Sequence, residues 1–433
     1  MILNPKKLQL SDVVGLDLET TGLVPWLHKI VVISITTDTE TYVLDVRKYS
    51  KTFLVNLFRG IGEKLVVGQR MKFDSSFIYY HYGVLLPKVW DVQVVDQVLT
   101  NGIKGYDYDL YNILNRSLGI RLTSDKEKKK HLQLSFVGLK DSSSLTEEQL
   151  EYAAGDTKYL LDLYRHQWLE VRNKGLERII YELEIPLLPV LVKMEVRGCR
   201  IDVKGWREKI KIWEKSRDAA KEVLDIELKA LGQDFSAIGE KYTLERKSVS
   251  NTIYSLFDGP ITTVEELGNC FNYGSSDQIL WLFEVVGEKP PTTVDKKTNE
   301  VKPTTGEGFL KTYLTENPKS KLRSFIGKLL KLREYEKLLS TYGESFLAKL
   351  DSNGFIHTSY TQAYTDTGRL SSAGPNLQNI PATDMRRFFV ADEGELMVTA
   401  DMDGAEARIA GAYSGEPGLV NSFLKGEDLH SRL

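Results

Sequence analysis

The chain has 433 residues, enough for roughly two to four domains, and its share of hydrophobic (42%) and charged (27%) residues is typical of a soluble globular protein. A net charge of −3 provides no overall basic surface, so binding to a nucleic acid would have to depend on local basic patches. The two cysteines, Cys199 and Cys270, form no CxxC pair or Cys/His cluster, which excludes a zinc-finger framework and indicates reduced thiols.

The N-terminal segment MILNPKKLQLSD lacks the apolar core of a signal peptide, and no later stretch reaches the roughly 18 apolar residues of a membrane span. We therefore expect a cytoplasmic protein without membrane contact. Short runs rich in β-branched residues then predict strands at residues 13–18, 30–36, 41–46 and 64–68, with helical patterns between and after them. This alternation predicts an α/β layer over residues 11–100.

Residues 146–170 carry apolar side chains at helical spacing, and Thr146 with Gln149 forms a capping-box pattern at the start. The charged run 125–130 before this helix is interpreted as a solvated loop, and contact with a DNA backbone is the alternative. A domain boundary is expected near residues 171–175. The pattern of residues 177–230 is helical again, with breaks expected at Pro189 and Gly198.

Residues 231–320 are polar and show little periodicity, and the Pro/Thr/Lys-rich segment 289–308 predicts a loop. Apolar positions from 322 to 342 predict a long amphipathic helix. The last part, 351–433, returns to turns and short strands, and the chain contains no internal repeat.

Four acidic residues lie in positions suited to chemistry. Asp17 and Glu19 are two residues apart in a predicted strand, so both side chains point to one face. Asp74 stands at the entry to an apolar helix, and Asp156 lies in the 146–170 helix one turn after Tyr152. Hydrolysis of a phosphodiester needs a neutralised phosphate, an activated water and a stabilised leaving oxygen. Two Mg²⁺ ions about 3.5–4 Å from each other, each held by carboxylates, supply all three.

The alternative is that these are unrelated surface acids, but a mostly apolar strand would not carry two carboxylates without partners. In their order and spacing, the segments LDLETTGL, KFDSSFI and EYAAGDTKYL resemble the three exonuclease motifs of the DEDDy proofreading family. The resemblance implies that two metal ions are held by Asp17, Glu19, Asp74 and Asp156. It also implies that Tyr152 orients the attacking water.

The same resemblance implies that Thr20 and Leu23 contact the terminal nucleotide. One position departs from the family. Its second motif commonly reads GQNLKYD, whereas this chain reads GQRMKFD, so Arg70 stands where the family has an Asn that helps to orient DNA. We expect an altered affinity for DNA with the metal ligands intact.

The second half of the chain resembles the family A DNA polymerases of the bacterial DNA polymerase I type. EIPLLPVLVKMEVRGCRID resembles the entry into the thumb, FNYGSSDQILWLFEVVG the tip of the thumb, and LRSFIGKLLKLREYEKLLSTYGESFL the helix that returns to the palm. Taken alone, each segment could be an element of any helical bundle, but their joint order argues against chance.

The segment TDTGRLSSAGPNLQNIP, residues 365–381, resembles the primer–template-binding motif of that family. The resemblance implies that Arg369 reaches the minor groove of the duplex, and that Asn376, Gln378 and Asn379 support the DNA or the palm. An Arg and amides can contact minor-groove acceptors that all base pairs share, without choosing a sequence. The alternative is a surface loop with ordinary turn chemistry.

RRFFVADEGELMVTADMDGAEARIAGAYSG resembles polymerase motif A. The resemblance implies that Asp401, after a predicted strand at 396–400, is a metal ligand for nucleotidyl transfer, and that Glu406 excludes ribonucleotides. Arg408 matches a structural Arg and His430 a later His of the family. The family pattern DYSQIELR is kept only in part, which leaves nucleotide selection open.

The sequence ends at Leu433 inside this match, so we expect that the polypeptide alone does not polymerise DNA. A split gene with a second, C-terminal polypeptide, a fragment and an interrupted gene all remain open. The exonuclease motifs begin near Met1 with no 5′-nuclease domain before them, as in phage-type members; for a phage protein the location would be the host cytoplasm.

The expected architecture is an RNase-H-like α/β exonuclease domain (1–172), a mostly helical thumb (173–350) and the start of an α+β palm (351–433). The main hypothesis is a proofreading 3′-5′ exonuclease that acts in DNA replication. It uses two Mg²⁺ ions, for which Mn²⁺ can substitute, releases 5′-mononucleotides, and binds single-stranded 3′ ends and primer–template DNA. One alternative is an assembly subunit of a split polymerase that binds primer–template DNA. An RNA-trimming DEDDy exonuclease is the other, although residues 184–433 argue against it.

Overall fold

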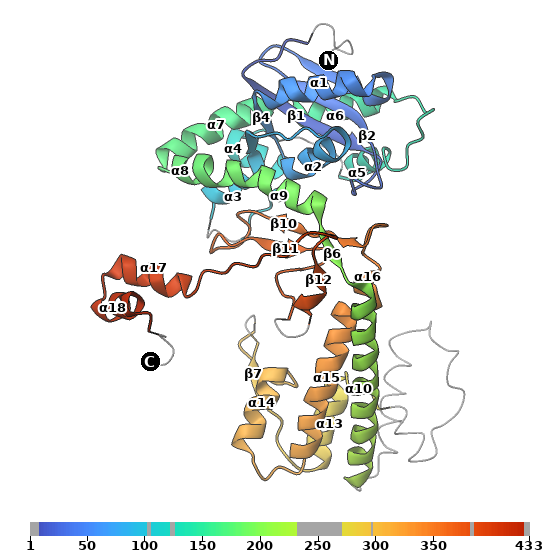
Figure 1. Cartoon of the computed structure of the whole chain (residues 1–433), viewed down its shortest axis with the longest axis vertical. Helices are drawn as coiled ribbons and strands as arrows, with labels where there is room; N and C mark the ends of the chain where they lie inside the picture. Colours follow the sequence, from blue (N-terminus) through green and yellow to red (C-terminus); the bar gives the residue numbers. More distant parts are fainter. Residues whose placement is uncertain are drawn as a thin grey trace. The chain divides into compact units, whose positions relative to one another are not determined.

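The computed structural model describes residues 8–101, 105–121, 126–231, 271–295, 298–381 and 385–427, with only the backbone at 126–129 (Figure 1). Contacts divide the chain into two compact units, Met1–Phe388 and Phe389–Leu433. Cys270, His430 and much of the polar segment 231–320 lie outside the described residues. In the described ranges, no helix is both long and apolar enough to cross a membrane.

A five-stranded mixed sheet forms the centre of the N-terminal domain. Its strands are β1 (Val13–Thr20), β2 (Ile30–Thr36), β3 (Thr41–Asp45), β4 (Leu65–Gly68) and β5 (Val89–Asp91). Their order is β3-β2-β1-β4-β5; β1, β2 and β3 are antiparallel neighbours, whereas β4 and β5 run parallel to β1. The four strands predicted from the sequence are present and the short β5 was missed, so the RNase-H-like α/β prediction is confirmed.

The two faces of β1 have different chemistry because side chains alternate along a strand. Val14, Leu16 and Leu18 enter an apolar cluster that includes Phe58 and Phe77 of the helices on that side. The intervening positions put acidic side chains on the opposite face. The strand is therefore fixed in register by its apolar side and presents its carboxylates on the other.

Most of the helices described in the N-terminal domain pack around this sheet. The helices described there are α1 (Lys51–Gly62), α2 (Met71–Tyr82), α3 (Val92–Leu99), α4 (Leu110–Leu118), α5 (Lys126–Leu134), α6 (Glu147–Thr157) and α7 (Leu160–Asn173). α1 and α2 pack with the apolar side of β1, while α6 contacts β1, β2 and β3 and α7 contacts β1 and β4.

Two predictions for this region are wrong. The charged run at 125–130 is interpreted above as a loop, but α5 begins at Lys126. The helix predicted over 146–170 is two helices, since Tyr159 between α6 and α7 has non-helical backbone angles. The predicted capping box is confirmed: Thr146 Oγ1 accepts the N–H of Gln149, and the Gln149 side chain accepts the N–H of Thr146.

The rest of the first unit is mostly helical, as predicted. Its helical elements are α8 (Glu177–Ile179), a π turn (Ile180–Glu184), α9 (Ile185–Arg197), α10 (Val203–Ala230), α13 (Ser276–Val285), α14 (Glu307–Glu316), α15 (Arg323–Tyr342) and α16 (Glu344–Leu347). Helix α9 continues through Pro189, where a break was predicted, and ends at Gly198, which has a φ of 67°. α10 and α15 lie side by side (Figure 1) and share an apolar core with α13 and α14.

The short strands of this unit are β6 (Cys199–Ile201), β7 (Thr292–Val294), β8 (Val301–Pro303), β9 (Phe355–Ile356), β10 (Ser359–Thr361) and β11 (Ser371–Ala373). β7 and β8 pair as an antiparallel hairpin inside the segment predicted to be a loop, so that prediction is wrong. Single-turn 3-10 helices occur at Val46–Lys48 and Arg386–Phe388.

The second unit contains β12 (Phe389–Val390), α17 (Ala405–Ser414) and α18 (Pro417–Lys425). The strand predicted at 396–400 is not formed among the described residues, although Leu396, Met397 and Val398 form an apolar run. A strand exists only where a neighbouring strand pairs with its backbone. The apolar pattern alone therefore could not show whether a neighbouring strand is present.

Candidate metal centre

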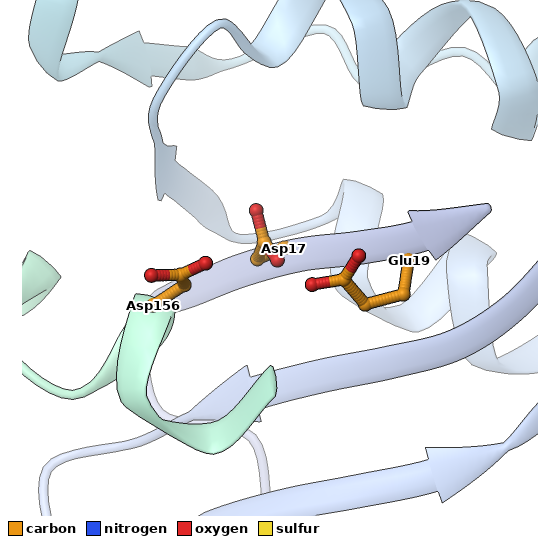
Figure 2. A group of neighbouring side chains, drawn as sticks. All are labelled: Asp17, Glu19 and Asp156. Atoms are coloured by element: carbon orange, nitrogen blue, oxygen red, sulfur yellow. The ribbon is translucent and has the colours of Figure 1, made fainter. Parts of the chain in front are cut away.

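Three carboxylates converge beside the sheet. Asp17 and Glu19 project from the same face of β1, and Asp156 reaches them from the last turn of α6 (Figure 2). One carboxylate oxygen from each lies within 4.8 Å of the others. In the described parts of the chain this is the one group of three or more His, Cys, Asp or Glu side chains with such spacing.

Close packing of helix against strand makes this approach possible. Gly15 lies on the face of β1 that carries Asp17, and a Cβ there would be 3.3 Å from Cβ of Thr36 and 3.4 Å from Cβ of Leu160. The absence of a side chain at Gly15 lets the junction of α6 and α7 lie against the strand. Asp156 is thereby brought level with Asp17.

A buried hydrogen bond fixes the end of α6. The Thr36 hydroxyl on β2 donates to Oγ1 of Thr157 at 2.8 Å, and the Thr157 hydroxyl donates to the carbonyl oxygen of Ala154 at 3.2 Å. Thr157 is fully buried and directly follows Asp156. The bond between Thr36 and Thr157 ties the end of α6 to the sheet. The bond from the Thr157 hydroxyl to the Ala154 carbonyl lies within the last turn of α6, where the helix ends.

Asp74 lies beside this group but is not part of it. It is buried in the first turn of α2. Burial raises the pKa of Asp74 well above its usual range, the carboxylates of Asp17 and Asp91 raise it further, and the backbone N–H of Leu18 lowers it. Asp17 is therefore the member of the group of three whose charge acts on Asp74.

Asp91 positions the start of α2, and the sequence reasoning missed it. Its carboxylate accepts backbone N–H groups from Arg70 (3.2 Å) and Met71 (2.8 Å) on α2, and from Gln93 (3.0 Å) and Val94 (3.4 Å) on α3. Burial raises the pKa of Asp91 to about 6, so it is mainly a carboxylate at neutral pH. The signal available in the sequence was an Asp at the end of a short apolar run, immediately before a helical pattern.

Arg70 stands at the N-cap of α2 with a left-handed backbone (φ 54°). Its Nε donates to Oε1 of Gln93 at 3.0 Å. The family resemblance places an Asn at this position, and Asn tolerates the left-handed region better than Arg does. The backbone at residue 70 is therefore a physical reason for that Asn, separate from any contact with DNA.

Tyr152 lies one turn before Asp156. Burial, followed by the charges of Asp156 and Glu19, raises the pKa of the Tyr152 phenol far above its usual range. The phenol is therefore protonated at every physiological pH. It can donate a hydrogen bond, but it cannot serve as a base.

Thr20 and Leu23 lie where β1 ends and the loop to β2 begins. The Thr20 hydroxyl donates to the carbonyl oxygen of Gly22 at 2.7 Å, so it shapes this loop. Leu23 is 79% exposed. Two further bonds, between Thr21 and Lys29 at 2.9 and 3.0 Å, close the loop and hold Leu23 at its surface.

The motif at 365–381 lies on a β-hairpin. β10 and β11 pair antiparallel, with Ser359 opposite Ala373, and Arg369 lies in the loop between them. Oδ1 of Asn376 accepts the Ser372 hydroxyl at 2.9 Å. The same oxygen accepts the N–H groups of Gln378 (3.0 Å) and Asn379 (3.2 Å).

Other bonds join this loop to its surroundings. The Gln378 side chain donates to the carbonyl oxygen of Leu370 at 3.0 Å, and the carbonyl oxygen of Asn379 accepts the Tyr342 hydroxyl at 2.7 Å. The side-chain amides of Asn376 and Gln378 thus organise the loop that presents Arg369, and Asn379 takes part through its backbone.

The two acidic residues of the second unit that the sequence singled out, Asp401 and Glu406, are exposed. Asp401 accepts the N–H of Met402 at 2.9 Å, and Glu406 lies in the first turn of α17. Arg408 donates from Nε to the carbonyl oxygen of Asp403 at 2.7 Å and stacks over the ring of Phe423. The described structure therefore gives Arg408 a structural place in this unit, and Asp401 belongs to no group of three or more closely spaced His, Cys, Asp or Glu side chains among the described residues.

Two regions of the chain match the sequence models of two known protein families. The sequence model of the 3′-5′ exonuclease family matches residues 3–172, and that of DNA polymerase family A matches residues 247–433. The N-terminal part of the chain is thus similar to the 3′-5′ exonuclease family and the C-terminal part to DNA polymerase family A. DNA polymerase I of Pseudomonas aeruginosa is 26% identical to this chain over 98% of the chain and 43% of that protein.

Two other relatives give a similar result. DNA polymerase I of Aquifex aeolicus is 27% identical over 98% of the chain and 64% of its own length. The thermostable DNA polymerase I of Thermus thermophilus is 31% identical over 61% of the chain and 27% of its own length. The chain thus spans less than two thirds of the length of each of these three relatives.

A solved structure shares the fold. The polymerase domain of Pol1 from M. smegmatis, in complex with DNA primer-template and dNTP, gives a TM-score of 0.69 over 96% of this chain and 62% of that chain, at 20% identity. The prediction of a separate C-terminal polypeptide finds no support in these comparisons. The predicted domain boundaries at 172/173 and 350/351 stay predictions.

The donor set of the metal centre fits hard divalent cations. Carboxylate oxygens are the ligands that such ions prefer, and three of them within 4.8 Å repel one another without a cation between them. Asp74 adds a fourth carboxylate next to Asp17. The residues present therefore suit divalent metal ions.

Proposed function

We propose that this chain is a DNA 3′-5′ exonuclease that removes nucleotides from 3′ ends during DNA replication and releases 5′-mononucleotides. The observation that carries the proposal is the convergence of Asp17, Glu19 and Asp156 within 4.8 Å, inside the region that matches the 3′-5′ exonuclease family. We propose that it acts in the cytoplasm.

Two Mg²⁺ ions, for which Mn²⁺ can substitute, would be held by Asp17, Glu19, Asp74 and Asp156. When bound, such ions neutralise the phosphate charge, activate the attacking water and stabilise the leaving oxygen. Asp17 belongs to the group of three and is also a charged neighbour of Asp74, which supports its use as a shared ligand.

The remaining residues of the site would bind and orient the substrate. Tyr152, protonated at neutral pH, would donate a hydrogen bond that orients the attacking water. The exposed Leu23 would pack on the terminal base, and Thr20 would hold the loop that carries Leu23. Arg70, next to the start of α2, would contact the DNA strand.

In the polymerase region, Arg369 would reach the minor groove of primer–template DNA from a loop that Asn376, Gln378 and Asn379 organise. Asp401 would be a metal ligand for nucleotidyl transfer, and Glu406 would take part in nucleotide selection. That the polypeptide does not polymerise DNA on its own stays a prediction.

The experiment that tests the proposal compares the chain with a variant carrying Asp17→Ala and Glu19→Ala. Each is incubated with a 5′-labelled single-stranded DNA oligonucleotide and Mg²⁺. Stepwise shortening from the 3′ end by the wild type, and none by the variant, is the expected result. No shortening by the wild type, together with firm binding of primer–template DNA, would instead favour a DNA-binding assembly subunit.

A second prediction concerns the Thr36–Thr157 hydrogen bond. Thr157→Val keeps the shape of the side chain but leaves the buried Thr36 hydroxyl without this partner, so we expect a loss of about 1–3 kcal/mol in the free energy of unfolding. Displacement of Asp156 should also lower kcat for single-stranded DNA about tenfold or more, with little change in KM.

Thr157→Ser is the matched control, because it retains the hydroxyl. It should keep kcat within about threefold of the wild type, since only a methyl group is lost. If Thr157→Val kept the wild-type kcat, the hydrogen bond would not position Asp156.

A further inference from the structure

Residues 357–360, which include the first residues of the hairpin that carries Arg369, contact the exonuclease domain at two separate places. The first contact is with the loop between β1 and β2. The rings of Trp26 and His357 stack with centroids 3.8 Å apart and planes at 29°. Trp26 belongs to the same loop as Leu23, so this contact touches the edge of the proposed exonuclease site.

The second contact is with helix α2. Lys72, two residues before Asp74, forms an ion pair with Glu195 of α9 and donates to the Ser359 hydroxyl at 2.9 Å and to the carbonyl oxygen of Tyr360. The N–H of Tyr360 donates to the same Glu195 carboxylate at 2.5 Å. One cation and one carboxylate thus join α2, α9 and β10.

This ion pair differs from the surface pairs of the chain in its burial. The side chains of Lys72 and Glu195 are 18% and 14% exposed, whereas those of Arg165 and Asp38 are 56% and 55% exposed. An exposed pair separates easily, but separation of a largely buried pair leaves a charge without compensation. α2 and β10 are therefore expected to move together.

The same segment is continuous with the loop that presents Arg369. β10 pairs with β11 on the other side of that loop, and the Gln362 side chain donates to both the carbonyl oxygen (3.0 Å) and the carboxylate (2.8 Å) of Glu184. The chain from His357 to Gln362 is thus held at both ends. A displacement of the Arg369 loop is therefore expected to pass through a few packed residues to α2 and to Asp74.

We propose that residues 357–360 couple the loop carrying Arg369 to the exonuclease centre, with Lys72 and Glu195 as positioning residues that set the placement of α2. The coupling rests on the proposed function, because it joins the proposed duplex-binding loop to the proposed nuclease site. Engagement of duplex DNA by the hairpin alters the mobility of α2, and through it the position of Asp74.

Hydrogen–deuterium exchange tests this without any hydrolysis. The chain is measured in EDTA, with and without a blunt-ended hairpin duplex whose binding is followed by fluorescence anisotropy. In the wild type, the duplex is expected to change amide exchange in α2 by about two- to thirtyfold. Arg369→Ala should abolish that change. An unchanged α2 in the wild type, or a duplex that does not bind, would overturn the proposal.

The decisive variant is the double substitution Lys72→Met with Glu195→Gln, which removes both charges together and so avoids a lone buried charge. Its α2 should no longer respond to duplex, although the duplex still binds. Trp26→Leu removes the other contact and should weaken the response. Arg165→Met, which breaks an exposed ion pair of the same domain, should leave it intact.

Single-stranded DNA distinguishes a failure of the coupling from a failure of the proposed nuclease function. It should protect α2 directly in the wild type and in the double variant, because it would bind at the exonuclease site itself. The nuclease assay with Mg²⁺ then tests the proposed function independently of the coupling. If α2 of the double variant responded to duplex as the wild type does, the coupling would be absent even in an active nuclease.

Discussion

Replacing Asp17 by Asn and Glu19 by Gln is expected to slow 3′-end hydrolysis of single-stranded DNA by about a thousandfold or more, equivalent to ~4 kcal/mol of transition-state stabilisation. The two amides have nearly the shape of the carboxylates, so the fold should be kept. They lack the negative charge that holds divalent cations, and two of the three oxygens within 4.8 Å lose it together. Single-turnover kinetics with saturating Mg²⁺ measure the loss.

In EDTA, where no metal ion is bound, the same substitutions are expected to stabilise the fold although they slow hydrolysis. Asp17, Glu19 and Asp156 repel one another in the metal-free chain, so neutralising two of them should raise the free energy of unfolding by about 0.5–2 kcal/mol. Adding Mg²⁺ or Mn²⁺ should raise Tm of the wild type, since binding to the folded state stabilises it, and should leave Tm of the variant nearly unchanged.

Asp162→Asn provides the matched control, because it neutralises an exposed carboxylate on α7 of the same domain. It should change neither the hydrolysis rate nor the metal-dependent Tm. If the Asp17/Glu19 variant retained a tenth or more of the wild-type rate, or if its Tm still rose with Mg²⁺, these carboxylates would not be the metal ligands.

The sequence predicted most of the metal centre because its geometry is local. A period of two along a strand places Asp17 and Glu19 on one face, and a helical turn places Tyr152 near Asp156, whatever the rest of the fold. The convergence of strand and helix required the motif resemblance. The burial of Asp74 beside Asp17 could be expected only once α2 was placed against β1.

Other features depend on tertiary partners that periodicity cannot reveal. The break between α6 and α7 follows Thr157, whose hydroxyl bonds Thr36 on a strand 121 residues away in the sequence. The segment 396–400 has a strand pattern but no paired neighbour among the described residues. Lys72 and Glu195 are separated by 123 positions, so their pairing was invisible before the fold was known.

Asp91→Ala is expected to reduce the free energy of unfolding by about 3–5 kcal/mol, because it leaves the first N–H groups of two helices without their acceptor in a buried place. An ordinary N-cap serves a single helix. Asp91 accepts N–H groups from α2 and α3 at once, so both helix starts lose support together. Urea denaturation followed by circular dichroism measures the change.

Asp109→Ala is the appropriate comparison, since Asp109 caps α4 alone, accepting the N–H of Asn112 at 2.9 Å, and should cost only about 1 kcal/mol. Asp91→Asn should lie between the two: it keeps an oxygen for Arg70, Gln93 and Val94 but turns an amide NH₂ towards the N–H of Met71. Since Met71 begins the helix that carries Asp74, both Asp91 variants should also lower kcat for 3′-end hydrolysis. Equal losses of stability for Asp91→Ala and Asp109→Ala would mean that the double cap contributes no more than a single one.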